Sequence, residues 1–119
     1  MFYRQWSFPA GHLEENDAIK EATRREVFEE TGCKVKLTGV LPIQHKFDNA
    51  ETWIMVKFIA EIEDENIKYD EKEIVDVKWI NIEEIKNMKK SELRSYEMSL
   101  NFLEDYEKKI IYPFDIFKS

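Results

Sequence analysis

The chain has 119 residues, of which 43% are hydrophobic, 13% aromatic and 36% charged, and its net charge is −7. This size and composition predict one folded domain spanning residues 1–119 and argue against a disordered protein. The excess of negative charge makes a nucleic-acid polymer an unfavourable partner, because such binding draws on clustered Lys and Arg.

The sequence carries no pattern typical of export or membrane insertion. No apolar run approaches the roughly 18 residues of a transmembrane helix, and the first residues lack the sections of a signal peptide. We therefore expect a cytoplasmic protein with no membrane partner. The single cysteine, Cys33, cannot form an internal disulfide and is expected to pack inside the domain.

The first third of the chain predicts a strand, a loop and a helix. The aromatic stretch 2–8 suits a strand, and 9–16 is expected to form a loop. A helix is predicted from Asp17, as its N-cap, to about Thr31, with Gly32 as a left-handed C-terminal cap.

The remaining two thirds predict strands followed by helices. Alternating or blocked apolar residues indicate strands over 34–40, 51–62 and 73–80. A short helix is expected to open at Asn81 and a longer one to cover 91–106. The apolar tail, 110–117, is expected to pack back on the domain.

Three glutamates of the first helix are spaced to share one face. Glu26, Glu29 and Glu30 stand at i, i+3 and i+4, which places their carboxylates within about one turn. They share a sector with Ile19 and Ala22, which is the face expected to look inward. Hard divalent cations would offset this charge. Judged on charge alone, a solvated acidic helix is the commoner explanation.

The order of residue types around this helix favours a metal site. It runs Gly, five residues, an acid, seven residues, Arg-Glu, an aliphatic, one residue, Glu-Glu, one residue, Gly and an apolar residue. This order resembles the Nudix box, on Gly11, Asp17, Arg25, Glu26, Val27, Glu29, Glu30, Gly32 and Cys33. Asp17 stands where the family usually has Glu, and Cys33 fills a position that is usually aliphatic.

The resemblance implies an α/β fold, a Nudix-type α/β/α sandwich around a mixed sheet. It implies that Glu26, Glu29 and Glu30 hold Mg²⁺ or Mn²⁺, with Asp17 supporting the metal site. Arg25, Glu26 and Glu29 would be the catalytic residues, with Arg25 bracing the glutamate face. The implied reaction is attack by water on a phosphorus of a small nucleoside diphosphate derivative, with Glu26 as the candidate base.

Residues outside the glutamate face are candidates for substrate binding. By the resemblance, Gly11 and His12 of the loop would lie near the substrate, although a lone loop histidine more often faces solvent. A further acid is often recruited from outside the box, and Glu71 or Glu73 could serve; the alternative for both is a solvated loop. Aromatic strand residues such as Trp53 are expected in the core.

A narrower likeness, to the NudJ-type branch of the family, appears at both ends of the chain. It rests on segments 6–14, 93–95 and 112–113. The likeness implies hydrolysis of small pyrophosphates and of nucleoside di- and triphosphates.

The segment before the box is short. Nudix domains normally have a longer one, which supplies a strand pair to the sheet and part of the substrate pocket. We therefore expect the N-terminal strands to be missing here. Because unpaired strand edges associate readily, we expect a homodimer that completes the sheet.

Two other functions stay open. The missing strands favour a Nudix-like nucleotide-binding or regulatory domain with weak catalysis, whereas the intact Arg25, Glu26, Glu29 and Glu30 favour an enzyme. An acidic helical interaction module, outside the family, would show no saturable stabilisation by Mg²⁺.

Overall fold

The computed structural model describes residues 5–14, 18–47, 51–64, 67–68, 71–72, 74 and 76–118. Its helices are α1 (Ile19–Thr31), α2 (Ile82–Lys86), α3 (Tyr96–Glu107) and the 3-10 helix η1 (Phe114–Ile116). Its strands are β1 (Lys34–Val40), β2 (Gln44–Phe47), β3 (Thr52–Met55), β4 (Phe58–Asp64) and β5 (Tyr112–Pro113). None of the described helices is long and apolar enough to cross a membrane.

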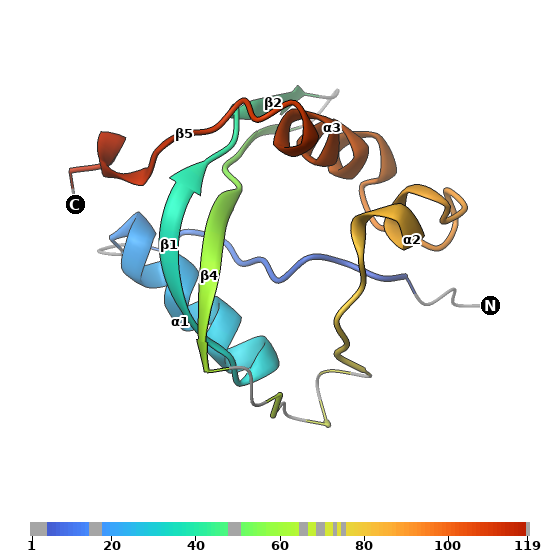
Figure 1. The fold of residues 1–119 in the computed structure, drawn as a ribbon, viewed down its shortest axis with the longest axis horizontal. Helices are drawn as coiled ribbons and strands as arrows, with labels where there is room; N and C mark the ends of the chain where they lie inside the picture. Colours follow the sequence, from blue (N-terminus) through green and yellow to red (C-terminus); the bar gives the residue numbers. More distant parts are fainter. Residues whose placement is uncertain are drawn as a thin grey trace.

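Two antiparallel sheets organise the described residues. One has the strand order β4-β1-β5, and the other pairs β2 with β3. Helix α1 packs against β1, while α2 and α3 lie together in another part of the molecule (Figure 1). Residues 5–14 run across the molecule from the α2 side toward the α1 side (Figure 1). This segment therefore connects the two helical regions.

Helix α1 ends at the predicted residue but begins later than expected. Gly32 adopts the left-handed conformation, with φ 79° and ψ −2°, and its N–H donates to the Phe28 carbonyl over 2.7 Å. At the other end, Ala18 occupies the N-cap position without a side-chain hydrogen bond. The predicted capping residue was therefore wrong, and Asp17 itself lies outside the described residues.

The central strand was predicted with its correct bounds. In β1 the side chains alternate between exposed and buried, with Val35, Leu37 and Val40 buried. Val40 is the most deeply placed of these, at 1% exposure, and it pairs with Phe58 of β4. Cys33, just before the strand, is 3% exposed, which confirms its expected packing.

The predicted strand over 51–62 is divided into β3 and β4. The break falls at Val56 and Lys57, and the Leu41 N–H donates to the Lys57 carbonyl over 3.0 Å. Strand β2, which the apolar pattern did not predict, pairs antiparallel with β3. The break turns the chain from the small sheet into the main one.

Two other predicted strands were wrong within the described residues. Over 73–80, the described residues form no strand, and Ile80 packs instead against the core cluster of Ile85, Leu93 and Leu103. Over 2–8, the described residues contain only an isolated parallel bridge between Trp6 and Leu93. Trp6, Phe8 and Ile80 of these segments are partly buried against that cluster, whereas Trp79 is exposed.

The C-terminal third follows the prediction more closely. The Asn81 side chain accepts a hydrogen bond from the Glu84 N–H over 2.8 Å, so Asn81 caps α2 as expected. Helix α3 begins at Tyr96, later than predicted. The tail packs back through β5, whose Tyr112 pairs with Val40 of β1.

Candidate active site

The glycine-containing loop lies against the acidic face of α1. The Ala10 N–H donates a hydrogen bond to Oε2 of Glu30 over 3.0 Å. At the next residue, Gly11, an added Cβ would lie 2.5 Å from Cδ of Glu26. The loop therefore meets two carboxylates that are one helical turn apart, and the absence of a side chain at Gly11 makes the approach to Glu26 sterically feasible.

The three glutamates do not meet at a single point. The Glu26 side chain is 28% exposed and Glu30 is half-buried, whereas Glu29 is 59% exposed. Within the part of the chain that the structure describes, no group of three acidic, histidine or cysteine residues is close enough to hold a metal ion. Glu26 and Glu30 form the inner pair, and Glu29 lies nearer to solvent.

The surroundings of Glu30 disfavour its ionised form, mainly through burial. Burial raises the pKa of Glu30, and the charges of Glu26 and Glu29 raise it further; the Ala10 hydrogen bond and the charge of Lys57 lower it. The effects that disfavour the ionised form dominate. A divalent cation would relieve them, and carboxylate oxygens are the donors that Mg²⁺ and Mn²⁺ prefer, so the donor chemistry fits such a cation.

Arg25 bridges the inner and outer parts of the acidic face. Its Nη2 lies 3.8 Å from Oε1 of Glu26 and its Nε lies 3.9 Å from Oε1 of Glu29. The Arg25 side chain is 44% exposed. Because exposed ion pairs contribute little to stability, these contacts add little to the stability of the fold.

Lys57 is a charged residue near the site that the sequence analysis missed. Its ammonium lies 5.0 Å from the centre of the Phe8 ring, and it interacts electrostatically with Glu30. Burial lowers the pKa of Lys57, and the charge of Glu30 raises it. A signal was present in the sequence, because Lys57 is the single charged residue between Glu51 and Glu61.

The far end of the loop contacts the small sheet. The ring of His12 lies 5.2 Å from the ring of Trp53 in β3, tilted by 46°. His12 is exposed and Trp53 is half-buried, so Trp53 is not the fully buried core residue expected from its place in a strand. The two rings form a partly accessible aromatic surface beside the loop.

Three other acids expected near the site are not placed there by the structure. Asp17 and Glu73 lie outside the described residues. Glu71 is exposed in a turn. Their proposed contributions to metal or substrate binding stay predictions.

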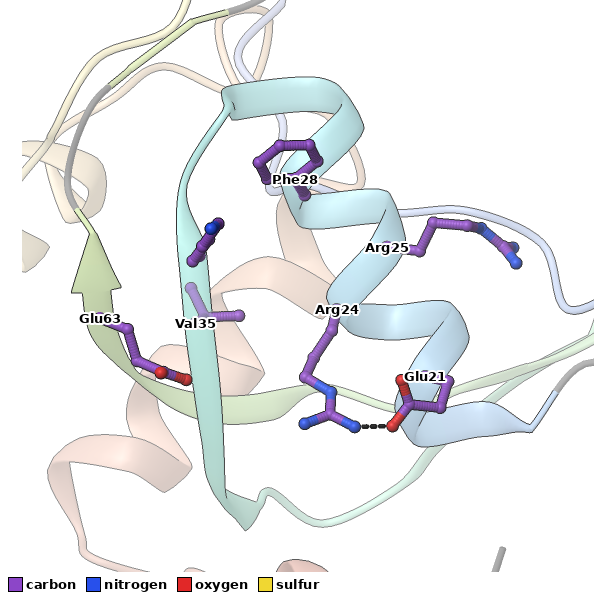
Figure 2. A pocket seen from close by; sticks show the side chains of 7 residues that line it. Glu21, Arg24, Arg25, Phe28, Val35 and Glu63 are labelled. Carbon is purple, nitrogen blue, oxygen red and sulfur yellow. Dashed lines mark ion pairs between the residues drawn. The ribbon is translucent and has the colours of Figure 1, made fainter.

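A shallow groove lies on a different side of α1. It runs between α1 and strands β1 and β4, and its lining residues are Glu21, Arg24, Arg25, Phe28, Lys34, Val35 and Glu63 (Figure 2). Arg24 forms an ion pair with Glu21 along it, whereas Arg25 points to the other side of the helix (Figure 2). Because Glu26 and Glu30 do not line this groove, we place the candidate site at the loop.

The sequence matches a known protein family. Residues 1–102 match the family model described as the NUDIX domain. The chain belongs to the Nudix family. Of the residues that resemble the Nudix box, Gly11 lies in the loop, and Arg25, Glu26, Val27, Glu29 and Glu30 lie in α1.

The Nudix relatives include proteins of different specificity. The chain is 40% identical over 76 residues to the NAD-capped RNA hydrolase NudC of Mannheimia succiniciproducens, covering 63% of this chain and 27% of that protein. It is 33% identical over 93 residues to the phosphatase NudJ of Shigella boydii, covering 76% of this chain and 59% of NudJ. The chain thus spans less than two thirds of either relative.

A solved structure confirms the predicted fold class. A NUDIX hydrolase from Nitrosomonas europaea superposes with a TM-score of 0.76 and 29% sequence identity, covering 97% of this chain and 78% of the other. The α/β fold of the Nudix family therefore extends over nearly the whole chain.

Proposed function

We propose that this Nudix domain hydrolyses a phosphoanhydride bond in a small nucleotide or similar diphosphate, using a divalent cation held by Glu26 and Glu30. The observation that carries the proposal is the pair of partly buried carboxylates under the Ala10–Gly11 loop, with charge that the protein leaves incompletely balanced. Glu29 and Asp17 would complete the ligand set.

The bound cation, Mg²⁺ or Mn²⁺, would neutralise oxygens of the diphosphate and favour attack by water. Glu26 would accept the proton of the attacking water, because it is partly shielded from solvent and lies against the loop. The water oxygen forms a bond to phosphorus as the bridging P–O bond breaks, and the leaving phosphate departs with the electron pair. Arg25 would keep Glu26 and Glu29 oriented.

The substrate would lie along the loop. Gly11 would allow close approach of the substrate to the main chain, and His12 with Trp53 offers a ring surface for a base or other planar group. Glu73, which lies outside the box, would contribute to substrate binding. The names of the relatives suggest NAD-type dinucleotides and small phosphate esters as classes to test, and the net charge of −7 favours a small substrate over a long RNA.

A substrate panel tests the proposal. Phosphate or pyrophosphate release with Mg²⁺ would be measured on nucleoside triphosphates, ADP-ribose, NAD, NAD-capped RNA, dinucleoside polyphosphates and thiamine-type pyrophosphates. We expect turnover on at least one compound, with a loss of about 100-fold or more in Glu26→Gln. Glu21→Gln is the matched control, because Glu21 lies on the same helix but lines the groove on its other side.

The main alternative is a nucleotide-binding or regulatory Nudix domain with weak catalysis. Such a domain would bind Mg²⁺ and a nucleotide without turning over any compound of the panel. An acidic interaction module would bind neither.

The predicted homodimer and cytoplasmic location stay predictions. In the main sheet formed by the described residues, β4 is an edge strand, and its Ile62 is 43% exposed. A second copy could pair along this edge. Light scattering after size-exclusion chromatography would give twice the monomer mass of 14.4 kDa for a dimer and the monomer mass otherwise.

A further inference from the structure

Lys57 lies between two strands, where its backbone is held by a hydrogen bond. It follows β3 and directly precedes β4. Its carbonyl accepts a hydrogen bond of 3.0 Å from the N–H of Leu41, which is 5% exposed, and the next residue, Phe58, pairs with the buried Val40. The side chain therefore starts from a well-anchored piece of backbone, which is the requirement for a group that positions a ligand.

The ammonium of Lys57 is directed to the loop whose main chain is hydrogen-bonded to Glu30. It lies over the ring of Phe8 at 5.0 Å from the ring centre. Two residues further along the same loop, the Ala10 N–H is bonded to Glu30. Lys57 thus extends from the sheet toward the acidic face of α1, which carries the carboxylates.

The charge of Lys57 is only partly compensated by the protein. Burial disfavours its ammonium form more than the charge of Glu30 favours it, and an aromatic ring supplies a modest attraction. A lysine that served only as the counter-ion of Glu30 would be expected in a direct ion pair. Among the ion pairs found between described residues, Lys57 takes part in none.

We propose that Lys57 binds a phosphate oxygen of the substrate, so that the diphosphate lies between the cation on Glu26 and Glu30 and the ammonium of Lys57. This inference rests on the proposed function, since it takes a cation-bound diphosphate as the ligand. Lysine is a common phosphate-binding residue that acts as a point charge. Lys57 would act in binding and would not take part in breaking the P–O bond.

Binding of a non-hydrolysable diphosphate tests this role apart from turnover. The Kd of methylenediphosphonate with Mg²⁺ would be measured by calorimetry for the wild type and for Lys57→Met. We expect binding to weaken about 10- to 100-fold, as for the loss of one charged hydrogen bond. Lys36→Met, which removes the same charge from an exposed position of β1, should change the Kd by less than about twofold.

Two further measurements separate ligand binding from a structural role. The affinity for Mg²⁺ alone should be unchanged or higher in Lys57→Met, because a nearby positive charge is lost. Lys57→Arg should recover most of the diphosphate binding, and in steady state KM should rise more than kcat falls. If Lys57→Met does not fold, Lys57→Gln gives the same comparison with a polar side chain.

The possible failures are distinguishable. An unchanged Kd for methylenediphosphonate in Lys57→Met and Lys57→Gln, with an active wild type, overturns the role of Lys57 and leaves the proposed function standing. A wild type that neither binds Mg²⁺ nor turns over any compound of the panel overturns both.

Discussion

The main-chain N–H of Ala10 donates a hydrogen bond to Oε2 of Glu30 over 3.0 Å, and this bond fixes the glycine-containing loop to the acidic face of α1. The bond favours the ionised form of Glu30, but burial and the neighbouring acids outweigh it. The carboxylate is thus held in a defined position at a cost in electrostatic energy. A site of this kind is stabilised when a cation binds.

Glu30→Gln should stabilise the metal-free protein at neutral pH. The folded-state pKa of Glu30 is raised above its ordinary value of 4.5. The contribution of Glu30 to the free energy of unfolding is therefore fully present below that value. This contribution is lost as the pH rises through the raised pKa. Glutamine keeps the acceptor for Ala10 but carries no charge.

Thermal unfolding in EDTA between about pH 4 and pH 8 measures this effect. The melting temperature of Glu30→Gln should exceed that of the wild type at pH 7, and the difference should shrink toward pH 4. With saturating Mg²⁺ the order should reverse, because the wild type gains stability from the bound cation. A variant that is less stable than the metal-free wild type at pH 7 would contradict the account.

Gly11→Ala should impair catalysis more than stability. Its Cβ would lie 2.5 Å from Cδ, 2.8 Å from Cγ and 2.8 Å from Oε1 of Glu26. These atoms belong to a flexible side chain, which can move away at little energetic cost. We expect kcat/KM to fall about 100-fold, as for other misplaced catalytic groups, with a melting temperature close to wild type. Activity at the wild-type level would show that Glu26 need not lie against the loop.

Gly32→Ala should destabilise the fold. Gly32 has φ 79°, and an added Cβ would lie 2.4 Å from the carbonyl oxygen of Lys68. The left-handed conformation alone costs about 1–2 kcal/mol for a non-glycine residue, and the clash is with backbone, which cannot move as a side chain does. Urea unfolding should show a free energy of unfolding lowered by at least this amount. An unchanged midpoint would refute the assigned cap.

Cys33→Ser should also lower stability, without a direct effect on the site. Cys33 is 3% exposed, and a buried hydroxyl without a partner costs about 1–3 kcal/mol. The native thiol should react slowly with a thiol reagent and rapidly once the protein is unfolded in urea. Fast reaction of the native protein would indicate an accessible cysteine.

Local features of the fold could be predicted from the sequence because neighbouring residues determine them. Gly32 ends α1 and Asn81 caps α2 through contacts within one helical turn. The alternation in 34–40 likewise predicts β1, since its buried side chains recur at every second residue. The spacing of Glu26 and Glu30 on one helical face is a local property as well.

Features that depend on distant residues could not be predicted in this way. The bridge between Trp6 and Leu93, and the break at Lys57, are set by packing between segments far apart in the chain. The apolar pattern of 73–80 suited a strand, but Ile80 is partly buried against the cluster of Ile85, Leu93 and Leu103. The approach of Lys57 to Glu30 is visible only once the loop, α1 and the sheet are placed together.

Metal-dependent hydrolysis is proposed to take place at Glu26 and Glu30. The most direct measurement is the rate of phosphate or pyrophosphate release at increasing Mg²⁺ concentrations, on the best compound of the panel, for the wild type, Glu30→Gln and Glu21→Gln. We predict saturable activation of the wild type and of Glu21→Gln, and loss of about 100-fold or more in Glu30→Gln. Equal Mg²⁺-dependent rates in all three proteins would contradict the account.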